Sequence, residues 1–253
     1  MKLKLKLLNY LFIVLAVLAV SCEKDDSSPE EKESIQDKGF TFDNEAVMNK
    51  VPENLKNSDD QYAKMCVDYV ESAMDMSAFV SQLTPPENAT LVEMKSAEAS
   101  GTYTWQFNGY GIYWTYSEEG EKAIWSVDIE IEGKKYDYID AWQLKDGSKG
   151  EVKYNFNYVC AYAGQQTTDC ETLLAKYTWE LKDDGSYKFL YTYDSNSTEY
   201  DYAFKYEVVI NKDGSGAIDY VTNDFVLYHM EWDAEGNGSW TYMNGSDTGS
   251  WTV

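Results

Sequence analysis

Guanidinium groups are missing from this chain. All 21 basic side chains are lysines, against 44 acidic ones, and the formal net charge is −23. Proteins bind nucleic acid by neutralising its phosphates with basic side chains, and anionic lipid headgroups attract the same side chains. The charge balance therefore argues against nucleic acid as a partner and against adsorption to anionic headgroups.

Histidine is also scarce. His229 is the only one, and no G-x-S-x-G motif accompanies it. A histidine-rich zinc site is thereby excluded, and Ser-His-Asp catalysis has no supporting motif. We expect no catalytic residue, no metal site and no cofactor.

The four cysteines fall into three settings. Cys66 lies among apolar residues and is expected to be a small buried hydrophobe, because a nucleophilic cysteine would need a nearby base. Cys160 and Cys170 flank a polar stretch, and in an oxidising compartment we expect them to form a disulfide. Cys22 follows an apolar run near the N-terminus.

That apolar run, residues 11–20, follows a basic head of three lysines. It is shorter than the roughly 20 residues of a transmembrane helix but suits the core of a secretory signal. The letters Ala-Val-Ser-Cys at 19–22 resemble the lipobox of bacterial lipoproteins. This resemblance implies a signal peptide over 1–21, removed by cleavage, and a diacylglycerol on the sulfur of Cys22. The alternative is an ordinary signal peptide with a cysteine near its cleavage site.

The letters Glu-Lys-Asp-Asp at 23–26 are similar to the acidic export signal of Bacteroidetes-type surface lipoproteins. The resemblance implies a lipid anchor in the outer membrane, an outward-facing domain, and an outer-membrane protein as a partner. Charge and low hydrophobicity favour disorder here, so residues 22–57 are expected to form a flexible acidic tether.

One amphipathic helix is predicted over 58–86. Ser58 and Gln61 have the spacing of a capping box, apolar residues then recur at three- and four-residue steps, and Pro85 and Pro86 end the pattern.

Residues 87–253 change to a period of two, as in the alternation of apolar and polar residues over 123–131 and 151–158. Short Asp-Gly and Asn-Gly turns separate these runs, and they lack the D-x-[DN]-x-[DN]-G spacing of calcium loops. The pattern predicts an all-β, antiparallel, up-and-down meander of roughly ten strands.

A wide sheet with one aromatic face must curl or be covered. We expect it to close into a barrel with the helix beside it, similar in outline to a lipocalin although no motif of that family is present. An open, curled sheet that cradles the helix is the alternative. The four letters GSWT occur at 238–241 and return as GSWT at 249–252.

The aromatic residues, 22 Tyr, 9 Phe and 8 Trp, are the best functional indication. Rings with polar tips suit a sugar or a small amphipathic ligand, whereas an ordinary core would account for them as filling. The candidate ligand-binding residues, assigned to the apolar side of their strands, are Trp105, Trp114, Trp125, Tyr138, Trp142 and Trp179.

Asp140 shares its strand parity with Tyr138 and Trp142, so the sequence makes it a candidate inward-facing carboxylate. A glycoside hydrolase would need a second carboxylate at a defined separation, while hydrogen bonding to tyrosines is the simpler role. The sequence therefore predicts a non-enzymatic binding or accessory subunit at the cell surface, with glycan or nutrient capture as its task. A lipocalin-like carrier is the alternative, and a hydrolase the remote one.

Overall fold

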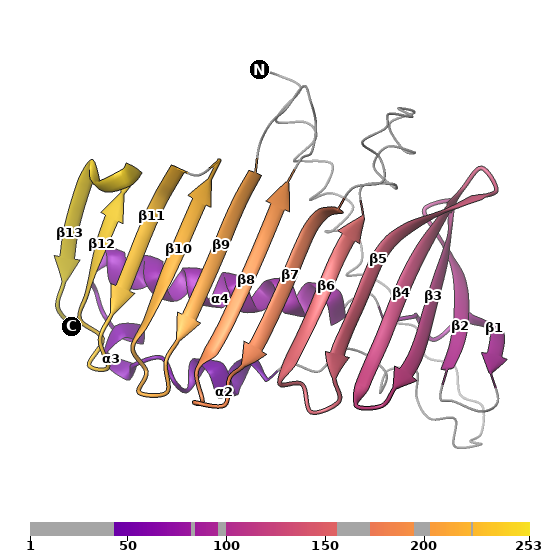
Figure 1. Cartoon of the computed structure of the whole chain (residues 1–253), viewed down its shortest axis with the longest axis horizontal. Helices are drawn as coiled ribbons and strands as arrows, with labels where there is room; N and C mark the ends of the chain where they lie inside the picture. Colours follow the sequence, from indigo (N-terminus) through magenta and orange to yellow (C-terminus); the bar gives the residue numbers. More distant parts are fainter. Residues whose placement is uncertain (1–42, 82–83, 96–99, 156–172, 195–202, 224) are drawn as a thin grey trace.

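One antiparallel sheet contains every described strand, in the order of the chain (Figure 1). The computed structural model describes residues 43–81, 84–95, 100–155, 173–194, 203–223 and 225–253. Cys22, Cys160 and Cys170 lie outside these ranges. The strands are β1 (Thr90–Lys95), β2 (Ser100–Phe107), β3 (Tyr110–Glu119), β4 (Lys122–Ile131), β5 (Lys134–Leu144), β6 (Lys149–Asn155), β7 (Leu173–Leu181), β8 (Tyr187–Asp194), β9 (Ala203–Ile210), β10 (Gly216–Thr222), β11 (Phe225–Trp232), β12 (Gly238–Tyr242) and β13 (Asp247–Trp251).

The all-β antiparallel meander is confirmed, but the sheet is not closed. It has 13 strands, more than expected, and the first and last strands are its two edges. The barrel expectation is wrong and the open sheet is what forms. Helices lie along one side of the C-terminal half of the sheet and cover the aromatic residues there, so that part of the face is kept from water without closure (Figure 1).

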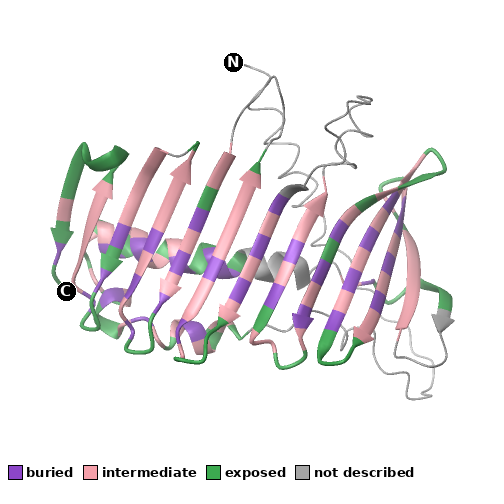
Figure 2. Ribbon diagram, in the orientation of Figure 1, coloured by how far each residue is buried: buried purple, intermediate pink, exposed green. Residues whose placement is uncertain are grey.

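The sheet has two chemically different faces, because successive side chains of a strand point to opposite sides. We call the side that carries Trp125, Tyr177 and Ile218 the packed face; these side chains are almost fully buried. We call the opposite side, which carries Glu151 and Glu207, the open face. Buried and partly buried residues therefore alternate along many of the strands (Figure 2).

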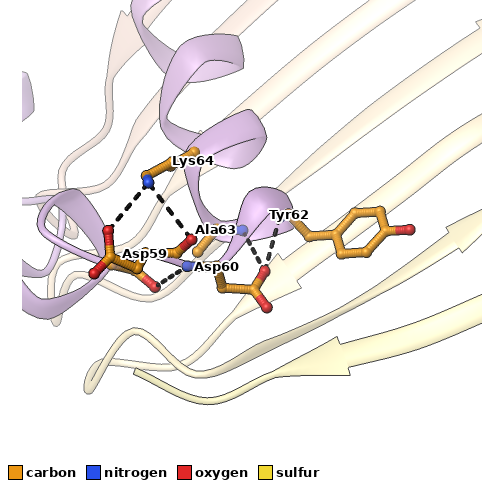
Figure 3. A network of polar contacts seen from close by, with 6 residues as sticks. Asp59, Asp60, Tyr62, Ala63 and Lys64 are labelled. Atoms are coloured by element: carbon orange, nitrogen blue, oxygen red, sulfur yellow. Dashed lines mark hydrogen bonds and ion pairs between the residues drawn. The ribbon is translucent and has the colours of Figure 1, made fainter.

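The predicted helix is α4, Gln61–Ser81. Its N-cap is Asp60 and not Ser58: Asp60 Oδ1 accepts hydrogen bonds from the backbone N–H groups of Tyr62 at 2.7 Å and Ala63 at 3.2 Å (Figure 3). An aspartate N-cap thus replaces the expected capping box, since Asp60 satisfies free donors of the first turn. Within the described residues, no helix has the length and apolarity needed to cross a membrane.

Two phenols and one aromatic stack fix α4 to the packed face. The Tyr177 hydroxyl donates to the carbonyl of Ala73 at 2.9 Å, and the Tyr206 hydroxyl donates to the carbonyl of Tyr69, one helical turn away. At the other end of the helix, Tyr62 stacks on Trp240 with the ring centres 4.3 Å apart. The helix therefore lies across the strands of the C-terminal half of the sheet (Figure 1).

Cys66 points from α4 into the core, as predicted. It is fully buried, and burial raises the pKa of its thiol to about 12. This thiol is an inert packing group at neutral pH.

The C-terminal part of the expected tether is folded. Residues 43–57 contain α2, Asn44–Met48, and α3, Glu53–Lys56. Val47, Val51 and Leu55 are buried in the core, which explains why this stretch is ordered despite its charge. The tether assignment for 22–57 is therefore wrong over this portion.

The hairpin turns at one end of the strands share one hydrogen-bonding arrangement. In the turns after β5, β7 and β9, an aspartate accepts a hydrogen bond from the backbone N–H of the serine two residues later. The turn glycine adopts a positive φ, as Gly214 does at +91°. Tryptophans of the neighbouring strands donate their indole N–H groups to turn glycine carbonyls: Trp179 to Gly147 at 3.1 Å, Trp232 to Gly214 at 2.8 Å, and Trp251 to Gly236 at 2.8 Å.

Candidate functional site

The open face is polar, and helices α2, α3 and α4 all lie on the other side of the sheet (Figure 1). Its middle strands carry lysine, glutamate and threonine in register, for example Glu151 beside Thr178 and Lys153 beside Lys176. A face of this kind needs no cover to be soluble.

Trp142 is the exception on this face. Of the eight tryptophans in the chain, seven lie on the packed face and Trp142 alone lies on the open face, partly buried. A large apolar ring on a polar surface is costly unless a packing partner or a ligand covers it.

A β-bulge in β5 explains why Trp142 and Asp140 point outward. Val127 pairs with Ile139 whereas Asp128 pairs with Asp137, so Tyr138 is the extra residue. The side-chain alternation is shifted by one residue at that point. Asp140 and Trp142 were expected to share the apolar side with Tyr138. The structure corrects this, since Asp140 is exposed on the open face.

Trp142 lines a shallow hollow between β4, β5 and β6. The Lys122 ammonium lies 4.2 Å from the centre of the indole ring. Asp140 Oδ2 accepts a hydrogen bond from Asn155 Nδ2 at 2.9 Å. Charged side chains around the ring in this hollow are Glu119, Lys122, Asp140, Glu151 and Lys153. The hollow therefore combines one flat apolar surface with donors and acceptors of both charges.

Beside the hollow, Glu151 binds two lysines. Its carboxylate oxygens lie 2.9 Å from Lys153 Nζ and 2.5 Å from Lys176 Nζ. Burial acts to raise the pKa of Glu151, but the hydrogen bonds from the two lysines outweigh it and the pKa is lowered. Glu151 is thus held as a carboxylate at neutral pH.

The same arrangement recurs two strands further on. Glu207 Oε2 lies 2.8 Å from Lys188 Nζ and 3.2 Å from Lys205 Nζ. Here too the pKa of the glutamate is lowered: burial opposes the shift, and the two lysine hydrogen bonds outweigh it.

Asp128 has the opposite shift. Burial, followed by the neighbouring charge of Asp137, raises the pKa of Asp128 on the open face. The two aspartates are direct cross-strand partners, so the pair contributes like-charge repulsion at neutral pH.

The single histidine also lies on the open face. His229 Nδ1 is 2.8 Å from Asp219 Oδ1, and its Nε2 is 3.8 Å from a carboxylate oxygen of Glu231.

In the part of the chain that the structure describes, no group of three or more His, Cys, Asp or Glu side chains is placed to hold a metal ion.

The other predicted ligand-binding aromatics belong to the packed face. Trp114, Trp125 and Trp179 are only 2%, 4% and 3% exposed and form part of the core. Trp105 and Tyr138 are partly buried and pack against that core. Trp125 also contributes to the hollow, but of this set only Trp142 has its side chain on the open face. The lysines around it were missed, because their cross-strand register depends on the bulge.

No family model, curated protein or solved structure matches this chain. A functional assignment must therefore be built from the geometry of the open face and from the N-terminal sequence.

Proposed function

We propose that this protein is a lipid-anchored, outward-facing outer-membrane protein that binds a glycan without chemically changing it. It would act as the binding or accessory subunit of a nutrient-capture assembly. The observation that carries the binding role is the hollow around Trp142, the one indole on the open face, where Ile124 is its cross-strand neighbour and no described helix covers it.

A sugar ring matches this hollow chemically. Pyranose rings have an apolar C–H face that packs on an indole, and hydroxyls at their rims that bond to charged groups. Glu119, Asp140 and Glu151 supply acceptors, while Lys122 and Lys153 supply donors. The Lys122 ammonium above the indole is on a flexible, exposed side chain that can move aside for a ring.

An open surface supports binding better than it supports a carrier. A lipocalin-like carrier would enclose its ligand inside a barrel, and this sheet is open at both edges. A long polymer, in contrast, can cross a flat face without threading through it. This geometry favours a polymeric ligand over a small enclosed one.

The binding role predicts a specific loss in Trp142→Ala. Affinity for the soluble neutral oligosaccharide that binds best among β-linked glucan, xylan and mannan probes should fall about tenfold, because the stacking surface is removed. Trp142→Phe should retain most of the affinity. Isothermal titration calorimetry measures both.

Tyr242→Ala serves as the matched control. This tyrosine is an exposed aromatic, 38% accessible, but it lies on β12 and away from the hollow. Its removal should leave affinity unchanged. Equal binding by Trp142→Ala and the unmodified protein would contradict the proposed site.

The anchor is tested separately in cells. Cys22→Ser should move the protein from the membrane fraction to the soluble fraction, because the serine lacks the sulfur that would carry the lipid. Mass spectrometry of the mature N-terminus should find an acylated Cys22. Retention of Cys22→Ser in the membrane would exclude the lipid anchor.

A further inference from the structure

The geometry points to an acidic linear glycan as the ligand, lying across the strands from the Trp142 hollow over the open face of β6–β9. This inference rests on the proposed glycan-binding function and adds the charge and the direction of the chain that is bound.

The first observation is a cationic row. Three rows of side chains cross β6 to β9 near the middle of the open face, and one of them contains no acid. It consists of Lys153 on β6, Lys176 on β7, Thr192 on β8 and Lys205 on β9, each beside the next in register. We call these four residues the lysine row. Its three lysines form ion pairs with Glu151 and Glu207 of a neighbouring row, so three ammonium groups face two carboxylates.

The two parallel rows do not cancel this charge. In one of them, Glu180 lies between Lys149 and Lys188. In the other, Glu151 and Glu207 are separated by Thr178 and Leu190. The three rows together hold five lysines and three glutamates. Glu151 and Glu207 each hold two lysines, so each of these clusters keeps one positive charge in excess.

The second observation is that the lysine row is continuous with the Trp142 hollow. Lys153 both lines the Trp142 hollow and begins the lysine row, and its in-register neighbour on the hollow side is Asp140 of β5. Adjacent strands are ~4.8 Å apart, so the row extends about 14 Å from the hollow. The ~4.8 Å distance between strands is close to the length of one sugar in an extended pyranose chain. One sugar unit would therefore lie over each strand. The lysine row therefore offers repeated contacts to a polymer that carries one carboxylate per sugar.

The net negative charge of the protein does not prevent this contact. Charges further away than about 8 Å are largely screened at physiological salt. An acidic sugar over the lysine row would be affected mainly by the adjacent ammonium groups together with Glu151 and Glu207, and each of these two clusters has two lysines to one glutamate. Each ammonium group can donate up to three hydrogen bonds to a carboxylate.

Oligogalacturonate and its fully methyl-esterified form are the test probes, because esterification removes the charge and keeps the backbone. The acid form should bind about tenfold more tightly, by calorimetry in near-physiological salt. Lys176→Gln/Lys205→Gln should remove most of that difference and leave ester binding unchanged. In this variant Glu151 keeps Lys153 and Glu207 keeps Lys188, so neither glutamate is left without a lysine.

Lys64→Gln/Lys212→Gln is the control of equal charge. Lys64 lies on α4 and Lys212 in the turn after β9, both exposed and outside the lysine row. Acid-form binding should be unchanged in this variant. A loss equal to that of Lys176→Gln/Lys205→Gln would show a general charge effect and overturn the assignment.

The remaining outcomes separate the two proposals. If acid and ester forms bind equally and both depend on Trp142, the acidic ligand is wrong and the glycan-binding function holds. If only the neutral probes bind, the acidic ligand is again wrong. If none of the glycans binds, both proposals fail.

Discussion

Gly216→Ala is expected to destabilise the protein by about 3 kcal/mol. A Cβ at this position would lie 2.2 Å from Trp232 Cζ2 and 2.4 Å from the carbonyl oxygen of Val209. The indole cannot easily move away, because its N–H group donates to the carbonyl of Gly214 at 2.8 Å. The added methyl group therefore meets both backbone and a fixed ring. Urea unfolding followed by circular dichroism measures the loss.

Gly101→Ala is the matched control in a strand of the same sheet. A Cβ there would meet its nearest neighbour, Leu91 Cδ1, at 3.4 Å, which is an ordinary contact. We expect a change within about 0.5 kcal/mol, as for most substitutions without a specific clash. Equal effects at Gly216 and Gly101 would refute the account of the glycine and tryptophan contact.

Tyr177→Ala should have the second large effect, a loss of about 4 kcal/mol in the free energy of unfolding. The ring is 2% exposed in the core, and its hydroxyl joins β7 to the Ala73 carbonyl of α4. Removing the ring creates a cavity under the helix. The same urea titration measures this variant.

Tyr177→Phe distinguishes the contribution of the ring to stability from that of the hydroxyl. It should cost only about 1 kcal/mol, the usual net value of one hydrogen bond. Tyr113→Phe is its control, since that hydroxyl donates to Glu130 Oε2 at 2.7 Å on the open face, where water can replace it. A larger loss at Tyr113 than at Tyr177 would argue against the attachment of α4 through Tyr177.

Local signals in the sequence were sufficient for the meander and the main helix. Alternating residues such as those of β4 predicted strands with one buried face, and the Asp-Gly turns predicted antiparallel neighbours. The helical period predicted α4 to within a few residues. These features depend on interactions between residues close in the chain, so one stretch of sequence contains the necessary information.

Features that depend on distant residues could not be predicted in this way. Whether a meander closes depends on the total twist and on what covers its apolar face, and no single strand determines either. The bulge at Tyr138 moved Trp142 and Asp140 to the open face, and no glycine or proline marks its position. The candidate site was therefore only partly predictable: Trp142 was identified, but its surroundings were not.

The strand order also has a consequence for folding during synthesis. Each strand pairs only with the strands before and after it in the chain, so the sheet can grow by one hairpin at a time as the polypeptide emerges. Helix α4 is made before any of the described strands, yet Tyr62 stacks on Trp240, near the end of the chain. The N-terminal end of its apolar stripe must therefore wait for nearly the whole polypeptide, and during that interval this end offers an exposed target to a chaperone.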